Sequence, residues 1–490
     1  MRYNSAMTAL SFVNTYSSRV QVKWIASAFV SNETEHYDIE GGYAIDQLDN
    51  QQGSGSFGQS VGTLGLGYFI NHARNDLYFS VINFAHQGWR KGRAPGSKLT
   101  WGAKYQIENI TDVFKEWKYS DSAAFGLVPN AFNNDSLFVS QYISSKTNIL
   151  NNRLSGFLQN QNTISDSFNL KLIYGARINY SSLNSQTVVS PRIQMFFEPN
   201  KRYNLRHYYV DSMQKKNIIV KAAFGYYYQP PFYREMRKFD GTVNTNLKAQ
   251  RSIHYVSGAE WEFKSFGRPF KFSSEAYYKK LDYMVPYLLD NIRIRYYGDN
   301  TSTGYATGFD TRVNGEFIKG LESWFTFSFL KTDEKIKYVN AGKEEVETGF
   351  LRRPTDRRVS AAIMFRDELP GHESYRMNLS LFFGSGLPYY LGGAARYNEG
   401  ITIPAYKRVD IGFSKVFVDN ETDGTKSRIN SQKRKRKIQH FSVNLEVFNL
   451  LQINNVVSYI WVKDFQNNVY GVPNYLTGRR LNLRFILRFN

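Results

Sequence analysis

Two glycine-rich segments are the first candidates for chemistry, because the backbone amides of glycine-rich loops can hold phosphate groups. The segment 53–58 (GSGSFG) has the G-x-G-x-x-G spacing of a dinucleotide-binding loop, but it follows a polar run and precedes no helical pattern. The strand–turn–helix geometry that holds a pyrophosphate is therefore not expected. The segment 92–98 (GRAPGSK) lacks the Gly-Lys-Ser/Thr ending of a P-loop. Both segments are predicted to be loops.

The seven histidines show no pattern of metal ligands. The sequence has no H-E-x-x-H pair, and His36, His72 and His254 each stand alone. We therefore expect structural or surface roles for them, and we predict neither a metal nor a cofactor. No nucleophile–base–acid set can be assigned, because such a set is defined by geometry rather than by order in the sequence. The chain is predicted not to be an enzyme.

The strongest concentration of charge is the segment 426–437 (KSRINSQKRKRK), in a chain whose formal net charge is +20. Such a run can be a solvated loop, a contact for lipopolysaccharide phosphates or a nucleic-acid patch. It lies between two predicted strands at 405–418 and 438–450, so a solvated loop is favoured and nucleic acid is the least favoured. If the C-terminus faces the periplasm, alternating strand directions place this loop outside the cell, beside lipopolysaccharide.

The elements that must position these residues are amphipathic strands. Side chains of a strand alternate between its two faces, and the final segment, 479–490, has one apolar and one polar face. The apolar face carries Leu481, Leu483, Phe485, Leu487 and Phe489, and the polar face carries Asn482, Arg484 and Arg488. The segment 268–283 repeats the pattern, with Phe270 and Phe272 on one face and Lys271 and Lys279 on the other.

Strand length favours a membrane barrel over a soluble sandwich. These segments reach about ten residues or more, as a tilted crossing of the hydrocarbon layer requires, whereas strands of soluble sheets usually have about five or six. No apolar run approaches the roughly 18 residues of a transmembrane helix. We predict about 20 strands in one domain, 1–490, near 5–16, 18–31, 61–71, 75–88, 97–110, 137–147, 151–161, 166–180, 185–198, 216–229, 251–265, 268–283, 302–316, 320–333, 356–367, 373–386, 405–418, 438–450, 455–465 and 479–490.

Several short motifs, taken in order, carry a resemblance to a known family. The segments 174–177 (YGAR) and 190–192 (SPR) resemble a G-x-R … S-P-R pair on adjacent strands, and 226–232 (YYYQPPF) is similar to an aromatic strand end. The segments 404–410 (PAYKRVD) and 447–451 (VFNLL) resemble a strand start and the N-L-F turn before the last hairpin. Together they resemble the barrel region of TonB-dependent outer-membrane receptors.

Further phrases narrow the resemblance to the large group of these receptors in Bacteroidetes-type bacteria. The phrases are 233–241 (YREMRKFDG), 291–296 (NIRIRY), 352–357 (RRPTDR), 384–388 (GSGLP) and 4–7 (NSAM). Each phrase is short, but their order extends over nearly the whole chain.

The resemblance implies an all-β fold, a transmembrane antiparallel β-barrel in the cell outer membrane. Complete members have a signal peptide, a TonB-contacting segment, a folded plug and a barrel of 22 strands. About 20 strands here imply an N-terminally truncated barrel portion, with the signal peptide, the plug and about two strands missing. In this family TonB pulls on the plug to open a path, so the chain alone is expected neither to close nor to transport.

The implied function is energised uptake of a scarce ligand, which could be a metal chelate, cobalamin, a glycan or a peptide. The implied partners are outer-membrane lipids and lipopolysaccharide, the TonB complex through the missing segment, and a surface lipoprotein. Nucleic acid is not an expected partner. The alternatives are a passive outer-membrane porin or adhesin, a soluble nucleic-acid-binding β-protein, and an outer-membrane protease or lipase. The many outward apolar faces argue against the soluble class.

Two sets of residues are candidates for specific roles. Arg484, Arg488, Lys271 and Lys279 lie on polar, luminal faces and could contact an anionic ligand, although solvating the lumen or pairing with plug carboxylates is the favoured role. The aromatic end of the last strand, with Phe485, Leu487 and Phe489, resembles the signal that the barrel assembly machinery reads. Asn490 after Phe489 departs from the aromatic last residue of that signal.

Overall fold

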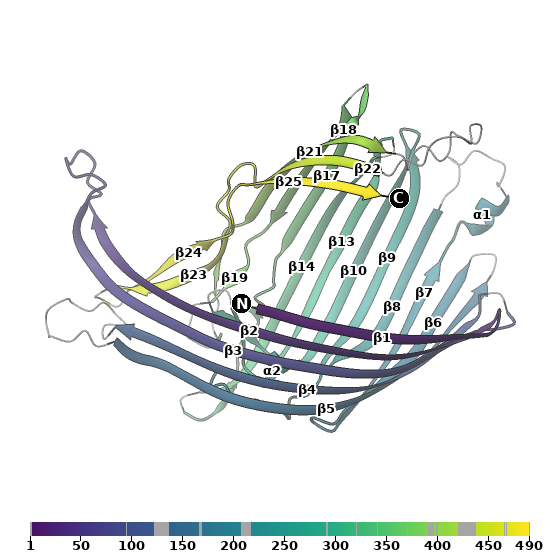
Figure 1. Cartoon of the computed structure of the whole chain (residues 1–490), viewed down its shortest axis with the longest axis horizontal. Coiled ribbons are helices and arrows are strands. Elements are labelled where there is room, and N and C mark those ends of the chain that lie inside the picture. Colours follow the sequence, from purple (N-terminus) through teal and green to yellow (C-terminus); the bar gives the residue numbers. More distant parts are fainter. Residues whose placement is uncertain are drawn as a thin grey trace.

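The computed structural model of the chain describes residues 2–94, 96–121, 137–165, 169–206, 217–290, 293–319, 321–340, 342–369, 371–390, 396–397, 400–419, 438–464, 466 and 468–489. These residues are almost entirely strand, and most strands join one antiparallel sheet of 19 strands (Figure 1). No helix among them is long and apolar enough to cross a membrane.

Successive strands of the chain are neighbours in this sheet. Along the wall they are β1 (Arg2–Ser17), β2 (Val20–Leu48), β3 (Ser60–Lys91), β4 (Lys98–Asp121), β5 (Leu137–Ser165), β6 (Leu170–Ser181), β7 (Gln186–Phe197), β8 (Asn217–Gln229), β9 (Gln250–Ser265), β10 (Arg268–Met284), β13 (Ser302–Ile318), β14 (Leu321–Val339), β17 (Val359–Leu369), β18 (His372–Gly384), β21 (Tyr406–Asp419), β22 (Ile438–Phe448) and β25 (Arg480–Phe489). Two short strands, β15 (Glu345–Glu347) and β16 (Leu351–Arg352), pair only with the last residues of β14.

The remaining elements belong to the connections. Three hairpins lie outside the large sheet, and they are β11 (Tyr287–Asp290) with β12 (Arg293–Tyr296), β19 (Pro388–Tyr389) with β20 (Ile401–Thr402), and β23 (Val456–Lys463) with β24 (Val469–Tyr475). The helices in the part of the chain that the structure describes are α1 (Lys201–Arg206) and α2 (Tyr233–Met236).

The alternating sequence explains why the wall is apolar outside and polar inside. On β5, Leu150, Leu154 and Leu158 are more than half exposed, whereas the neighbouring Asn151 is only 2% exposed. A soluble sheet would bury such leucines, but a wall that faces lipid exposes them and directs its polar side chains to the lumen. The predicted all-β membrane sheet is therefore confirmed.

Five of the predicted segments differ from the structure. The segments 61–71 and 75–88 form one strand, β3, and the segments 137–147 and 151–161 form one strand, β5. The prediction left breaks at 72–74 (HAR) and 148–150 (NIL), but both stretches continue their strands without interruption. β3 has 32 residues, about three times the length needed to cross the hydrocarbon layer, so it extends well beyond the membrane. The segment 455–465 is β23, in a hairpin outside the wall.

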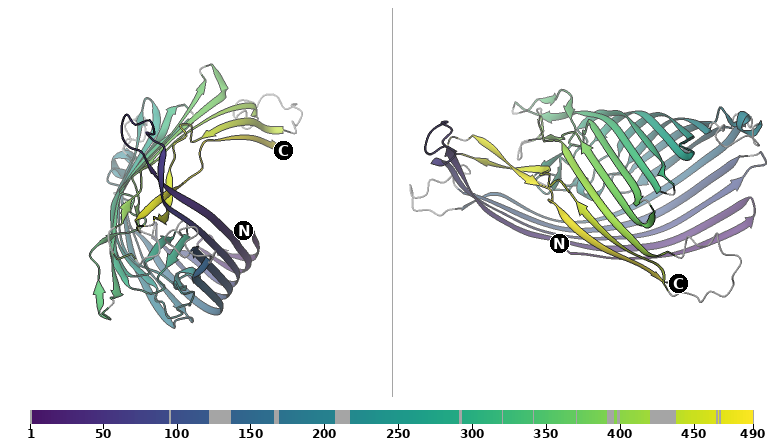
Figure 2. Two further views of the ribbon diagram at one scale, coloured as in Figure 1. Left: turned by 90° about the vertical axis from the view of Figure 1, so that its left-hand side faces the viewer. Right: turned by 90° about the horizontal axis from the view of Figure 1, so that it is seen from above.

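The sheet is an open arc rather than a closed cylinder. Among the described residues, β1 pairs only with β2 and β25 pairs only with β22. Figure 2 shows the arc in end view, with the edges near the two termini apart. Of the 19 strands, β15 and β16 extend β14, and the other 17 form the wall. An odd number of antiparallel strands makes the outermost strands, β1 and β25, run in the same direction (Figure 1).

The two ends of the wall differ in the length of their connections. At one end, which we call the turn end, most connections are short, such as 18–19, 266–267, 319–320 and 370–371, while 198–216 and 420–437 are longer, and the chain reaches Phe489 there. At the opposite end, the loop end, they include 230–249, 285–301, 340–358, 385–405 and 449–479. Outer-membrane barrels have short periplasmic turns and long extracellular loops. The loop end is therefore the extracellular end.

The basic segment 426–437 lies outside the described residues, but its flanking strands correct its predicted side. β21 ends with Asp419 opposite His440, and β22 begins with Ile438 opposite Phe489. The connection between them therefore starts and finishes at the turn end, with the C-terminal strand end. The placement outside the cell was wrong because 455–465 had been counted as a wall strand, and one strand fewer reverses the side.

Candidate functional site: an acidic ladder on the luminal wall

Three carboxylates form a row along β4, which we call the acidic ladder: Glu108, Asp112 and Glu116. They are four residues apart, and even spacing in a strand places all three on the same face, here the luminal one. Their exposed fractions are only 6%, 0% and 0%. Burying a carboxylate is costly unless it is paired and hydrogen-bonded, so each must have partners.

Asp112 receives two side chains from the loop that follows β8. The Tyr233 hydroxyl donates to Asp112 Oδ2 at 2.6 Å, and Arg237 forms an ion pair with the same oxygen. The Arg237 guanidinium also lies 4.5 Å from the centroid of the Phe114 ring. Burial and then the hydrogen bond to Asp112 raise the pKa of Tyr233 to about 12, so its proton is firmly held at neutral pH.

Glu116 receives two arginines from β12. Arg293 donates to Glu116 Oε1 at 2.6 Å, and Arg295 donates to both carboxylate oxygens at 2.7 Å. Arg295 Nε also lies 2.9 Å from Asp290, whose carboxylate pairs in turn with Lys118 of β4 at 3.1 Å. The β11–β12 hairpin is thus fastened to the wall by charge-assisted hydrogen bonds, which are stronger than neutral ones.

Glu108 is held by the wall itself rather than by a loop. Arg153 Nε lies 2.8 Å from Glu108 Oε2, and the Asn151 amide donates to the same oxygen at 3.0 Å. Asn151 in turn accepts a hydrogen bond from Ser181 on β6 at 3.0 Å. The ladder therefore joins the luminal faces of three adjacent wall strands to two extracellular loops.

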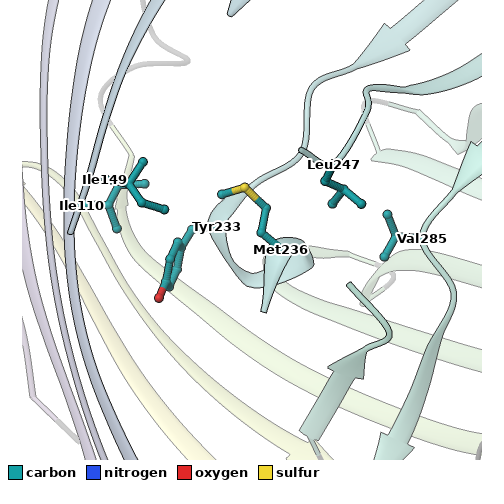
Figure 3. Close-up of a cluster of buried hydrophobic side chains, with 6 residues drawn as sticks. All are labelled: Ile110, Ile149, Tyr233, Met236, Leu247 and Val285. Atoms are coloured by element: carbon teal, nitrogen blue, oxygen red, sulfur yellow. The ribbon is translucent and has the colours of Figure 1, made fainter. Parts of the chain in front are cut away.

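An apolar cluster lies beside the ladder and fixes α2 against the wall. Figure 3 shows Tyr233 and Met236 of α2 between Ile110 and Ile149 of the wall on one side and Leu247 and Val285 on the other. All six side chains are less than 10% exposed. In Figure 1, α2 lies between the strands of the two opposing sides of the arc, which is where a luminal element is expected.

A cavity of about 420 Å³ opens between these loops and the wall. Its lining includes Arg234, Arg237, Arg293, Arg295, Asn75 and Glu35. Among the described residues, the buried Nε of Arg237 and Oδ1 of Asn75 have no hydrogen-bond partner. Buried polar atoms are normally paired, so these two atoms are exceptions beside the cavity.

The cavity presents arginine and amide groups that can hold a polar or anionic group by hydrogen bonds. Within the described ranges, no group of three or more His, Asp or Glu side chains is arranged to hold a metal ion. His36 and His72 pair with Asp76 and Asp38, and His254 stacks on Tyr227 with ring centroids 4.3 Å apart. The segment 53–58 is a turn between β2 and β3 with no helix after it, as predicted.

The cations predicted as ligand contacts are not brought together. Lys271 and Lys279 lie on β10, where Lys271 Nζ is 2.7 Å from Glu260 and Lys279 Nζ lies over the Tyr277 ring at 4.8 Å. Arg484 lies on β25, where it pairs with Glu446 at 3.2 Å, and Arg488 stands opposite His440. β10 and β25 are separated by many strands, so these residues do not form one site.

The predicted assembly signal lies on the edge strand β25. Phe485, Leu487 and Phe489 share one face of this strand and are about half exposed or more. This arrangement leaves their apolar side chains accessible, and their role in assembly stays a prediction.

The acidic ladder was missed from the sequence because its strand was taken to end at 110, whereas β4 continues to Asp121. The signal was present in two places. Glu108, Asp112 and Glu116 keep strand periodicity, and the phrases 233–241 and 291–296 carry the arginines that reach them. Two phrases that are distant in the sequence thus meet at one row of carboxylates.

The sequence profile of one family, described as "TonB dependent receptor-like, beta-barrel", matches residues 2–450. The chain belongs to this family. TonB-dependent receptors are integral β-barrel proteins of the cell outer membrane, they interact with TonB, and they are receptors and transporters rather than a class of enzyme. No curated protein matches this chain in sequence.

Solved structures of TonB-dependent receptors share its fold. The ferric-catecholate import receptor Fiu from K12 E. coli is 10% identical with a TM-score of 0.57, over 98% of this chain and 63% of that one. The RagAB peptide importer in its "open-open" state is 11% identical with a TM-score of 0.53, over 99% and 61%. BauA, the ferric preacinetobactin receptor from Acinetobacter baumannii, is 12% identical with a TM-score of 0.51, over 98% and 62%. The chain thus spans less than two thirds of these proteins.

Proposed function

We propose that this chain forms most of the barrel wall of a TonB-dependent transporter for the energised uptake of a scarce ligand, such as a metal chelate, cobalamin, a glycan or a peptide. The observation that carries the proposal is the acidic ladder, which fastens two extracellular loops inside the lumen beside a polar cavity. A passive pore needs an open lumen, whereas a receptor needs ordered loops that present contacts to its ligand. Binding and transport, rather than enzymatic turnover, are the proposed activities.

The named relatives support uptake but differ in ligand. Two of the similar structures are described as receptors for ferric catecholate and ferric preacinetobactin, and another as a peptide importer. Their identity to this chain is too low to transfer a ligand. The proposed ligand class therefore stays as broad as the four classes above.

We also propose that further strands close the wall. Unpaired backbone groups are costly in lipid, so the outer edges of β1 and β25 need partners. These strands run in the same direction, so pairing them directly would insert a parallel contact into an antiparallel barrel. An odd number of additional strands satisfies both edges, and five would complete the 22 strands typical of the family. This proposal of five additional strands replaces the expectation of about two missing strands.

The proposal extends to coupling and partners. We propose that residues 1–490 alone do not transport, because no folded plug lies among the described residues for TonB to move. The TonB complex would act through such a segment, outer-membrane lipids and lipopolysaccharide would surround the exposed leucines of the wall, and a surface lipoprotein would approach from the loop end.

Ligand binding by the purified chain in detergent tests the proposal. A panel of one ferric chelate, cobalamin, one oligosaccharide and one short peptide would be titrated by calorimetry, with ion conductance measured in planar bilayers. We expect saturable binding of one class that the Arg237→Gln variant weakens, and no steady conductance. Steady ligand-independent conductance without binding of any of the four would contradict the proposal and favour a passive porin.

A further inference from the structure

A second cavity, of about 350 Å³, opens on the luminal wall nearer the turn end than the acidic ladder. Its lining comes from β4, β5, β6, the start of β7 and both ends of the loop 230–249, and it includes Lys104, Arg153, Arg177, Asn179, Ser181 and Gln186. Three of these side chains are cationic and the other three are neutral groups that form hydrogen bonds. No carboxylate is among the described residues that line this cavity.

The cations of this cavity are incompletely neutralised. Arg153 pairs with Glu108, but the carboxylate of Glu108 is shared with Asn151 and Gln106. Among the described residues, neither Lys104 nor Arg177 has an acidic side chain within ion-pair distance. This distinguishes them from Lys271 and Arg484, which have Glu260 and Glu446 as partners. The cavity therefore carries an excess of about two positive charges.

Strand register gathers these charges into one patch. Lys104 stands opposite Ser155 and Gln106 stands opposite Arg153, so Lys104 and Arg153 are diagonal neighbours on one face. Arg177 stands opposite Phe157 on the next strand, with its guanidinium 5.7 Å from the ring centroid. Lys104 is within electrostatic range of Arg153 and Arg177, with Glu108 as the one carboxylate that acts on it among the described residues. Like charges this close repel one another, and an anion between them relieves the repulsion.

We propose that this cavity is a binding site for the phosphate or carboxylate group of a small anionic solute. Guanidinium groups offer paired donors in the plane that phosphate and carboxylate oxygens occupy, and the lysine adds a mobile point charge. The side-chain amides of Asn179 and Gln186 supply neutral donors around them. The binding itself does not depend on the proposed transport function, although its use as a step along an uptake path rests on that function.

Equilibrium binding to the purified chain in detergent tests the site, with inorganic phosphate and citrate as separate probes. We expect saturable binding of at least one probe, and the probe that binds identifies the anionic group. The double variant Lys104→Gln/Arg177→Gln should weaken that binding by about tenfold or more, as expected for lost hydrogen bonds to charged groups. The matched control, Lys271→Gln, removes a paired luminal cation and should leave binding within about twofold.

A conservative variant separates binding from folding. Lys104→Arg/Arg177→Lys keeps both charges and should keep most of the affinity that the neutral double variant loses. No saturable binding of either probe by the unsubstituted chain would overturn the proposal. Equal weakening by Lys271→Gln would overturn it as well, because the effect would then follow the general charge of the lumen. Both outcomes are independent of coupling to TonB and of the ligand panel used for the transport proposal.

Discussion

Among the described residues, Glu116 is the only carboxylate of the acidic ladder that pairs with two arginines. It is fully buried, and both arginines come from β12. A buried ion pair adds little net stability over apolar packing, but removing one partner leaves uncompensated charge. Fastening a loop in this way therefore makes its position sensitive to a single side chain. Asp112 plays the same part for the loop that contains α2.

Replacing Glu116 by glutamine should release the β11–β12 hairpin. Breaking a buried pair costs about 3–5 kcal/mol, and the lower part of that range is expected because Arg293 and Arg295 keep some exposure to water. Amide hydrogen exchange should accelerate in the segment 285–301. The control Glu446→Gln removes a pair whose Arg484 is exposed, and it should cost about 1 kcal/mol or less. Equal exchange in the two variants would contradict the role given to the ladder.

The stability that Tyr233 contributes at the acidic ladder should depend on pH. Its pKa is raised from 10.0 to about 12 by burial and by Asp112, so the folded state favours the neutral phenol. The stability that Tyr233 contributes is therefore fully present below pH 10.0 and is lost as the pH rises through about 12. The difference in stability between the unsubstituted chain and Tyr233→Phe should shrink across this interval. Denaturant unfolding at a series of pH values measures it, and a difference that grows would contradict the assignment.

Residue roles were only partly predictable from the sequence. The alternation divided the side chains of each strand between two faces, and it assigned Lys271 and Arg484 to the polar face. Their partners Glu260 and Glu446 depend on register between strands, which the sequence of one strand does not specify. Lys104 and Arg177 differ from Lys271 and Arg484 only in lacking a carboxylate within ion-pair distance among the described residues.

At the scale of elements, period-two alternation identified the wall, because both faces of each strand have uniform environments. It failed where a strand and a hairpin have the same local pattern. β23 alternates like a wall strand, yet it pairs with β24 in an extracellular connection, and Tyr459 and Trp461 pack there against Tyr389. Strand ends were also missed, since β2, β3 and β5 continue far beyond a membrane crossing.

Thiol labelling can test which end of the wall is outside. The sequence contains no cysteine, so each engineered thiol is unique. In intact cells, a membrane-impermeant reagent should label Ser54→Cys in the β2–β3 connection at the loop end. It should not label Ser431→Cys in the basic segment, whose flanking strands meet the turn end. Labelling of Ser431→Cys alone would show that the two ends are reversed.

At the scale of the whole molecule, the odd number of described wall strands has the widest consequence. Seventeen antiparallel strands cannot close on themselves without one parallel seam, and the closed barrels of the family avoid such a seam. The sequence predicted the membrane sheet and its family, but counting the segment 455–465 as a wall strand hid the odd number of wall strands. Counting about 20 strands suggested an even wall with two strands missing, whereas the closure proposed above needs an odd number of additional strands.

Disulfide cross-linking between the edge strands tests this central claim most directly. Double variants in outer membranes would pair Thr8→Cys on β1 with a cysteine at each position from 481 to 487 on β25. A disulfide needs Cα atoms within about 7 Å. Val443→Cys with Phe485→Cys, which are opposite each other on β22 and β25, is the positive control. We predict cross-linking of the control and none between β1 and β25. Efficient cross-linking of any β1–β25 pair would show that the wall closes on itself, and would contradict the account.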